Sequence, residues 1–256
     1  MRIAIYFIIC SFLSKASSAQ LDPIETDRPD QTESPFIVPP KYFQFEFGIN
    51  MEKDRKTGVN TTTFVLPTGL LKYGINNNVE LRVEFQSLTS KQKLNLINKR
   101  STSLEPVEVG LKARLWEEKG IIPKTSFIIH TTVPAFASKT YKKFSSAPNF
   151  RFTMQNSLSD RVAVGYNAGM EWNGEDLKPS YTYTIAPGFT FNSHWAAYIE
   201  LFGFINRGEA PEHSVDGGLY YFPGNNIKLD ISAGYGLTKI APDFYIALGC
   251  SFRLKP

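Results

Sequence analysis

The chain has 256 residues, of which 28 are Lys or Arg and 24 are Asp or Glu, and no block of basic residues predicts a nucleic-acid partner. Beyond Leu13 no apolar run reaches the roughly 18 residues that a membrane-spanning helix needs. Aromatic side chains are nevertheless abundant, with 20 Phe, 12 Tyr and 3 Trp. A polar average with many aromatics is typical of a membrane β-barrel, whose strands alternate lipid-facing and lumen-facing side chains.

The first residues have the three parts of an export signal. A short basic start precedes an apolar run over residues 3–13, and Ala19 ends a stretch of small and polar residues. We therefore expect residues 1–19 to be a signal peptide, cleaved near Ala19, rather than a buried helix. Its removal takes Cys10 away and leaves Cys250 as the only mature cysteine, so neither an internal disulfide nor a cysteine zinc site is expected.

Residues 20–40 are rich in Pro, Asp, Glu and Thr and show neither a helical nor a strand period, which predicts an extended periplasmic leader. Alternation of apolar and polar residues then begins at Phe43 and runs to Glu52, as expected for a strand with one apolar face. Similarly clear alternation recurs over residues 79–86, 107–115, 162–172, 227–235 and 244–254.

Six further segments are predicted as strands from their Thr, Val, Phe and Tyr content. Their alternation is interrupted near Pro67, Asn156 and Pro187. They cover residues 59–72, 123–134, 147–158, 179–190, 195–205 and 215–222.

These strands predict an all-β fold, a transmembrane antiparallel up-and-down β-barrel of about 12 strands over residues 41–256. A water-soluble β-sandwich is the alternative that composition alone leaves open. The links favour the barrel, because short and longer links largely alternate along the chain. The short ones are 73–78, 117–122, 159–161, 191–194 and 223–226, and the longer ones are 89–104, 135–146, 173–178 and 206–214. The alternation predicts short periplasmic turns, longer extracellular loops and both termini on the periplasmic side.

The polar strand faces direct charges of both signs into the predicted lumen, where they either pair with one another or line a narrow hydrated pore. No ring of a single sign is evident, so strong ion selectivity is not expected. The lumen candidates are Glu46, Glu80, Arg82, Glu84, Glu108, Lys112, Arg114, Arg151, Glu171, Glu200, Asp230 and Arg253.

The leader carries a compact group of charged side chains, Asp27, Arg28, Asp30 and Glu33. One interpretation is a plug in the periplasmic mouth, with Arg28 pairing with lumen carboxylates such as Glu46, Glu80 or Glu84. The other interpretation is a solvated periplasmic tail.

The same leader carries a family resemblance. Residues 24–35 read Ile-Glu-Thr-Asp-Arg-Pro-Asp-Gln-Thr-Glu-Ser-Pro, and the first strand that follows contains Gln44, Glu46 and Gly48. This stretch resembles the start of a family of predicted outer-membrane proteins, many from Bacteroidetes, described as transporters or as proteins of the meta-pathway of phenol degradation. The resemblance implies a barrel with a transport-like role, and it brings no catalytic residues with it.

These features predict a passive channel or transporter for small solutes in the outer membrane of a Gram-negative cell, with no cofactor, metal site or catalytic residue. A lipid-modifying enzyme is the rival hypothesis, and it needs a nucleophile beside a histidine. His130 shares a strand face with Ser126, but the strand period directs both into the lumen. A third hypothesis is a closed structural or adhesive barrel.

The expected partners are outer-membrane lipid and lipopolysaccharide, the barrel assembly machinery and a small-molecule solute, with no nucleic acid. Gly249, Phe252 and Leu254 form a pattern that resembles the C-terminal signal recognised by the assembly machinery. The basic loop 89–104 either touches lipopolysaccharide phosphates or stays solvated. Its cations are Lys91, Lys93, Lys99 and Arg100.

Overall fold

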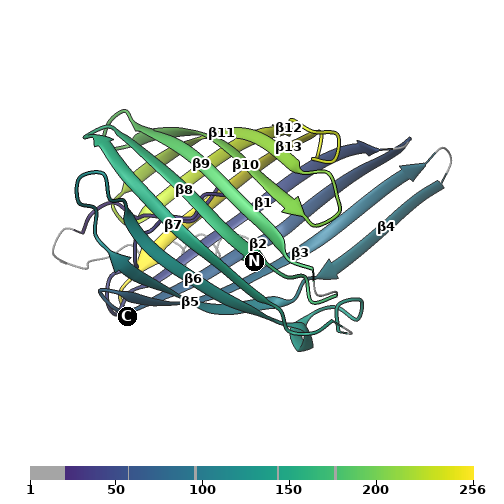
Figure 1. Ribbon diagram of the computed structural model, residues 1–256, viewed down its shortest axis with the longest axis horizontal. Coiled ribbons are helices and arrows are strands. Elements are labelled where there is room, and N and C mark those ends of the chain that lie inside the picture. The colour runs from purple at the N-terminus through teal and green to yellow at the C-terminus, as the bar shows by residue number, and fades with distance from the viewer. Residues whose placement is uncertain (1–20, 57, 95–96, 143, 176–177) are drawn as a thin grey trace, which may run out of the picture.

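The computed structural model describes residues 21–256 except 57, 95–96, 143 and 176–177, so the expected signal peptide lies outside the described residues. The described chain forms one antiparallel sheet that closes into a barrel (Figure 1). The strands are β1 (Phe43–Lys56), β2 (Val59–Asn76), β3 (Val79–Leu94), β4 (Ile97–Leu104), β5 (Val107–Trp116), β6 (Lys124–Val133), β7 (Pro148–Ser159), β8 (Val162–Glu171), β9 (Ser180–Thr190), β10 (Trp195–Asn206), β11 (Glu212–Gly224), β12 (Ile227–Gly236) and β13 (Phe244–Leu254).

The barrel closes because β1 pairs with β2 on one side and with β13 on the other, while β2 also pairs with β3. The inner half of β3, Val79–Glu84, pairs with β5, and its outer half, Ser87–Leu94, pairs with β4. Twelve strands therefore form the closed wall, and β4 is an additional strand beyond the rim. The predicted fold class is confirmed.

The extra strand corrects the expectation of an irregular loop at residues 89–104. This segment is the outer part of β3 together with β4, and both extend, beside the outer ends of β1 and β2, past the other strands at the end away from the C-terminus (Figure 1). Its residues are mainly Ser, Thr, Lys and Asn, so it lacks the apolar alternation that identifies a half-buried strand. Pairing between β3 and β4 forms this hairpin without a buried apolar face.

Side chains alternate between the lumen and the outer surface, as the period of two predicts. In β1, Gln44 and Glu46 are almost fully buried in the lumen, whereas Phe43 and Ile49 lie exposed on the outer surface. Phe45 stacks on Phe252 of β13 with ring centroids 5.0 Å apart. An apolar outer surface of this kind is suited to a hydrocarbon environment. In the part of the chain that is described, no helix is long and apolar enough to cross a membrane.

The interruptions expected at prolines have different structural outcomes. The register between β2 and β3 shifts between Val65 and Thr68, which places a bulge at Pro67. Pro187 instead stays within β9 opposite Val164. Asn156 also keeps regular pairing, and the shift in β7 comes between Ser157 and Ser159.

The two ends of the barrel differ in their links. Short links at 77–78, 160–161, 191–194 and 225–226 lie at the end where the C-terminus lies (Figure 1), as expected, but the link 117–123 at this end is longer than expected. The opposite end carries the longer links 134–147, 172–179 and 237–243. We call these the inner and outer ends.

Candidate functional site: the lumen and its leader

The leader, residues 21–40, lies inside the barrel near its inner end. The backbone N–H of Ile24 donates to Asn225 O at 2.8 Å, and that of Val38 donates to Glu80 Oε2 at 2.7 Å. Ile24 and Val38 are both buried. The leader is thus packed against the inside of the wall at both of its ends. The solvated tail, one of the two arrangements expected from the sequence, is not found.

Asp27 lies at the centre of a charge cluster built by three strands. Its carboxylate accepts hydrogen bonds from Arg82 Nη1 at 2.6 Å, Lys72 Nζ at 2.8 Å and Lys112 Nζ at 3.1 Å. Burial alone would raise the pKa of Asp27, but these three cations hold it well below the usual range for an aspartate. The leader is therefore held by an ionised carboxylate at neutral pH.

Wall carboxylates balance the same cations. Glu46 pairs with Lys72, and Glu80 pairs with Arg82 at 3.1 Å. Glu46 also accepts the backbone N–H of Asp27 at 2.9 Å. Because cations and carboxylates alternate, each buried charge has an opposite neighbour, as burial of charge requires.

Arg28 has partners other than those expected. Its guanidinium contacts Asp230 Oδ1 at 3.3 Å, Thr68 Oγ1 at 2.9 Å and Leu248 O at 3.1 Å. Arg28 thus pairs with a lumen carboxylate, as expected, but this carboxylate is Asp230 and not one of the three named examples, Glu46, Glu80 and Glu84. Glu46 and Glu80 bind Asp27, Val38 and wall cations instead, and Arg28 lies beside β1, β2 and β13.

Two paired glycines make room for Arg28. Gly48 of β1 lies opposite Gly249 of β13, and both belong to the lumen face. A Cβ on Gly48 would come within 2.2 Å of Arg28 Cζ, and one on Gly249 would come within 2.5 Å of Arg28 Nε. The absence of both side chains forms a notch in the wall for the guanidinium. Sequence reasoning missed it because only their pairing across two strands brings the glycines together.

Glu33 and Asp30 hold the rest of the leader. Glu33 accepts from Arg82 Nη2 at 2.6 Å, and Arg82 thereby lowers the pKa of Glu33 against the effect of burial. Asp30 accepts a hydrogen bond from Tyr220 at 3.3 Å. Burial raises the pKa of Asp30 to about 7, and the nearby Lys228 only partly opposes this effect.

The structure places most of the lumen candidates inside the barrel. Arg82, Lys112, Glu46, Glu80 and Glu200 are almost fully buried. Asp230 holds Arg28, and Arg253 donates to Asp22 O at 2.7 Å. Arg114 lies at the inner rim, where it pairs with Glu117 at 2.5 Å.

Arg151 donates to Gln31 O at 2.9 Å and so holds the leader from the wall. Lys72 and Lys228 contact the leader but were absent from the candidates. Lys72 was missed because it lies in β2, where the bulge breaks the period.

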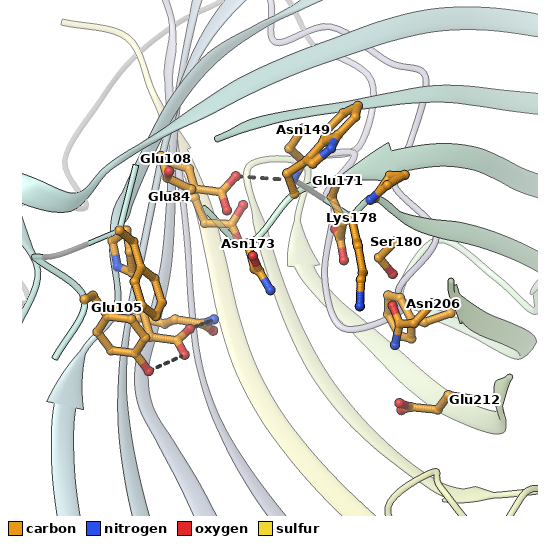
Figure 2. A pocket seen from close by; sticks show the side chains of 18 of the residues that line it. Glu84, Glu105, Glu108, Asn149, Glu171, Asn173, Lys178, Ser180, Asn206 and Glu212 are labelled. Atoms are coloured by element: carbon orange, nitrogen blue, oxygen red, sulfur yellow. Dashed lines mark hydrogen bonds between the residues drawn. The ribbon is translucent and has the colours of Figure 1, made fainter. Parts of the chain in front are cut away.

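A water-accessible vestibule opens above the leader toward the outer end. Its volume is about 590 Å³. Figure 2 shows carboxylates from opposite sides of the barrel pointing into it. Its charged lining residues are Glu84, Glu105, Glu108, Glu171, Glu209 and Glu212, with Lys178 and Arg207 as the cations. The lining is thus mainly acidic, in contrast to the mixed lining expected from the sequence, because the other lumen cations lie lower, where most of them contact the leader.

A second cavity of about 380 Å³ continues downward from the vestibule, with which it shares Glu84, Glu108 and Glu171. Its lower lining includes Asp27, Arg28 and other leader residues. The two cavities therefore form one polar path that enters from the outer end and meets the leader.

One group among the described residues approaches the arrangement of a metal site. Glu84, Glu108 and His130 each offer a ligand atom within 4.8 Å of the others. However, Arg82 Nε donates to His130 Nε2 at 3.0 Å, which places the imidazole proton on Nδ1, facing Glu108 Oε2 at 3.4 Å. A metal at Nδ1 would have to displace that proton beside a guanidinium. The geometry favours His130 as a neutral link between Arg82 and Glu108.

The Ser126–His130 pair does not form a nucleophile–base contact. Ser126 Oγ donates to Pro35 O of the leader at 2.6 Å, and the His130 ring is held by Arg82. Both side chains face the lumen, as expected. They bind the leader and the wall charges.

A closed antiparallel barrel with an apolar outer surface and a charged lumen defines the class, which is that of outer-membrane β-barrels. Three solved structures share the architecture, and each is 10% identical to this chain. An outer-membrane channel from Pseudomonas putida F1 has a TM-score of 0.62 and covers 86% of this chain and 97% of its own. The transport unit of the autotransporter AIDA-I from Escherichia coli has a TM-score of 0.54, with coverages of 84% and 89%. The NanC porin has a TM-score of 0.50, with coverages of 83% and 100%.

The chain belongs to the family described as "Putative MetA-pathway of phenol degradation", which it matches over residues 26–254. The match begins within the leader and ends at the last strand, so it spans the leader and the barrel together. No curated protein matches the sequence. The resemblance noted in the leader is confirmed at the level of this family.

Proposed function

We propose that the protein is a passive outer-membrane channel for small polar or charged solutes. The observation that carries the proposal is the continuous polar path from the outer end, about 590 Å³ in its upper part, to a leader that forms its floor. A structural barrel needs no such path, because paired charges or apolar side chains would fill its lumen.

We infer that the leader is the element that limits passage. It crosses the lumen between the vestibule and the inner end and contacts the wall through Asp27, Arg28 and Glu33. These contacts are non-covalent ion pairs, so they can break and re-form. Displacement of the leader would therefore open the path without unfolding the wall. The sequence expectation of a plug is retained on this basis.

We infer the cellular location from the same class of protein. An outer-membrane barrel must be exported, which supports cleavage of the signal peptide near Ala19 and insertion with the inner end in the periplasm. The leader, which resembles that of Bacteroidetes proteins, supports a Gram-negative source of that kind. The description of the family as part of a phenol pathway supports small aromatic solutes that carry a polar group as a first choice in transport assays.

We infer that the protein has no catalytic activity, and the contacts of Ser126 and His130 support this. An assay of lipid hydrolysis by the S126A and H130A variants tests it. Hydrolysis by the native chain that both substitutions abolish would favour the enzyme hypothesis.

Planar-bilayer recording of the refolded mature chain, in a salt gradient, tests the channel. The proposal expects discrete conductance steps, together with swelling of liposomes by small solutes. A chain that inserts and folds but gives neither conductance nor swelling would favour the closed structural or adhesive barrel.

A further inference from the structure

Beyond the barrel rim, β1 to β4 continue side by side as a small sheet whose outward face is basic. Cross-strand pairing places Lys53 opposite Thr62, Thr62 opposite Lys91, and Lys91 opposite Arg100, all in one row. Arg55 and Lys93 occupy the next row, since both pair with Asn60. Residues paired across antiparallel strands share a face, so the five cations lie together.

Side-chain contacts confirm that this is a common face. Lys91 Nζ lies 4.8 Å from the centroid of the Phe64 ring, one row nearer the barrel. Arg55 Nε donates to Asn60 Oδ1 at 2.7 Å within the outer row. The face is the outward one, because Lys53 continues the alternation of the outward residues of β1. Ile49 and Met51 precede Lys53 on this outward face of β1.

The carboxylates of this region do not pair with the five cations. Asp54 points to the opposite face and pairs with Lys56 at 3.0 Å, and Asp243 accepts the backbone N–H of Arg55 at 2.9 Å. Among the described residues, none of the five cations forms an ion pair. Lys91 and Arg100, moreover, are like charges in directly opposed positions, an arrangement that destabilises a strand pair. An anion bound between them would offset that cost.

The position of the basic face indicates which anion it binds. Met51 and Phe64 form the row just below, so the apolar outer surface ends about 7 Å, two residues, before the first cations. On a barrel wall, this is the level where hydrocarbon gives way to lipid headgroups. Basic side chains at that level attract anionic headgroups.

We propose that this face, Lys53, Arg55, Lys91, Lys93 and Arg100, binds phosphate groups of outer-leaflet lipopolysaccharide. The proposal rests on the proposed outer-membrane location, with the hairpin at the external end. It assigns the protruding β3–β4 hairpin a role as a lateral lipid contact, separate from the polar path through the lumen.

Two neighbouring residues provide the matched test. Arg100 belongs to the basic face, whereas Lys99, opposite Gln92, belongs to the other face of the same strand. Binding of phosphorylated lipopolysaccharide to the full mature chain, refolded in uncharged detergent, is measured for R100Q, K99Q and the triple variant K53Q/K91Q/R100Q. Gel mobility before and after heating confirms that each variant is folded.

R100Q is expected to weaken binding about fivefold, the ratio expected when one cation near an anionic surface is lost. The triple variant is expected to weaken it by tenfold or more, and K99Q by less than twofold. Dephosphorylated lipopolysaccharide should bind the native chain as weakly as phosphorylated lipopolysaccharide binds the triple variant. Equal losses for R100Q and K99Q, or binding that is insensitive to dephosphorylation, would overturn the proposal. Channel conductance is expected to be unchanged in R100Q, so failure here is distinct from failure of the channel proposal.

Discussion

Asp27 brings the leader and three wall strands together through one carboxylate. Lys72, Arg82 and Lys112 come from β2, β3 and β5, and each lies within 3.1 Å of an Asp27 oxygen. Removing one member of a buried ion cluster destabilises it by about 3–5 kcal/mol, because the remaining charges stay buried without compensation. Here Lys72 keeps Glu46, and Arg82 keeps Glu80, so the cost is smaller. The cluster still gains excess positive charge, and displacement of the leader would let water reach it.

The D27N substitution is therefore expected to release the leader more often. Open-channel events in planar bilayers should become at least threefold more frequent than in the native chain. The matched control is D22N, since Asp22 is exposed and its backbone oxygen, not its carboxylate, contacts Arg253. If D27N and D22N gate alike, Asp27 does not hold the leader.

Asp30 makes the docking of the leader in the lumen depend on pH, with the opposite sign to the effect of Asp27. It faces Lys228 of β12, Asp216 and Tyr220 of β11, and Tyr198 and Glu200 of β10. A free aspartate has a pKa of about 3.9, whereas burial raises that of docked Asp30 to about 7. The docked leader thus binds an additional proton between these values, so docking weakens as pH rises toward 7 and is constant above it.

We expect open events of the native chain to increase from pH 5 to pH 7 and then to level off. D30N, which cannot ionise, should lose this component, whereas D22N should keep it. Recording at pH 5, 6, 7 and 8 checks the expectation. Identical profiles for D30N and the native chain would show that Asp30 does not control docking. The lowered pKa of Asp27 adds a loss of docking only at strongly acidic pH.

At the scale of elements, residue periodicity predicted the wall strands and the inward direction of their charges. Alternation in β1, with apolar Phe43 outside and Gln44 inside, depends only on the strand period. The hairpin of β3 and β4 was not predictable in the same way, because strands that bury no face show no apolar alternation. The position of the Arg28 side chain was also not predictable, since its notch depends on the register between β1 and β13.

That notch predicts non-additive effects of substitution. G48A should cost about 1–3 kcal/mol of unfolding free energy, because its methyl group overlaps Arg28 and forces it out of the notch. In an R28A background the same change should cost much less. Denaturant unfolding in detergent measures both. G188A is the control, since a Cβ there meets nothing nearer than 3.9 Å. Equal costs of G48A in both backgrounds would contradict the notch.

At the scale of the whole molecule, the charges are divided by level. The cations near the inner end contact the leader and wall carboxylates, and the vestibule above them is lined mainly by glutamates (Figure 2). A path lined mainly by one sign attracts the opposite ion. We therefore expect the open channel to prefer cations.

The E108Q/E209Q variant should reduce that preference, seen as a smaller reversal potential in a tenfold salt gradient. E175Q is the control, because Glu175 is exposed and does not line the vestibule. A reversal potential near zero in the native chain, or an equal shift in both variants, would show that the vestibule glutamates do not set selectivity.

The account depends most on the claim that the leader limits passage through an otherwise continuous lumen. Deletion of residues 21–35 removes Asp27, Arg28 and Glu33 and leaves every strand intact. Single-channel conductance of the deleted and native mature chains, refolded and recorded side by side, is the direct test. The account predicts a several-fold larger and more steadily open conductance after deletion. Unchanged conductance and gating in a folded, inserted barrel would contradict it.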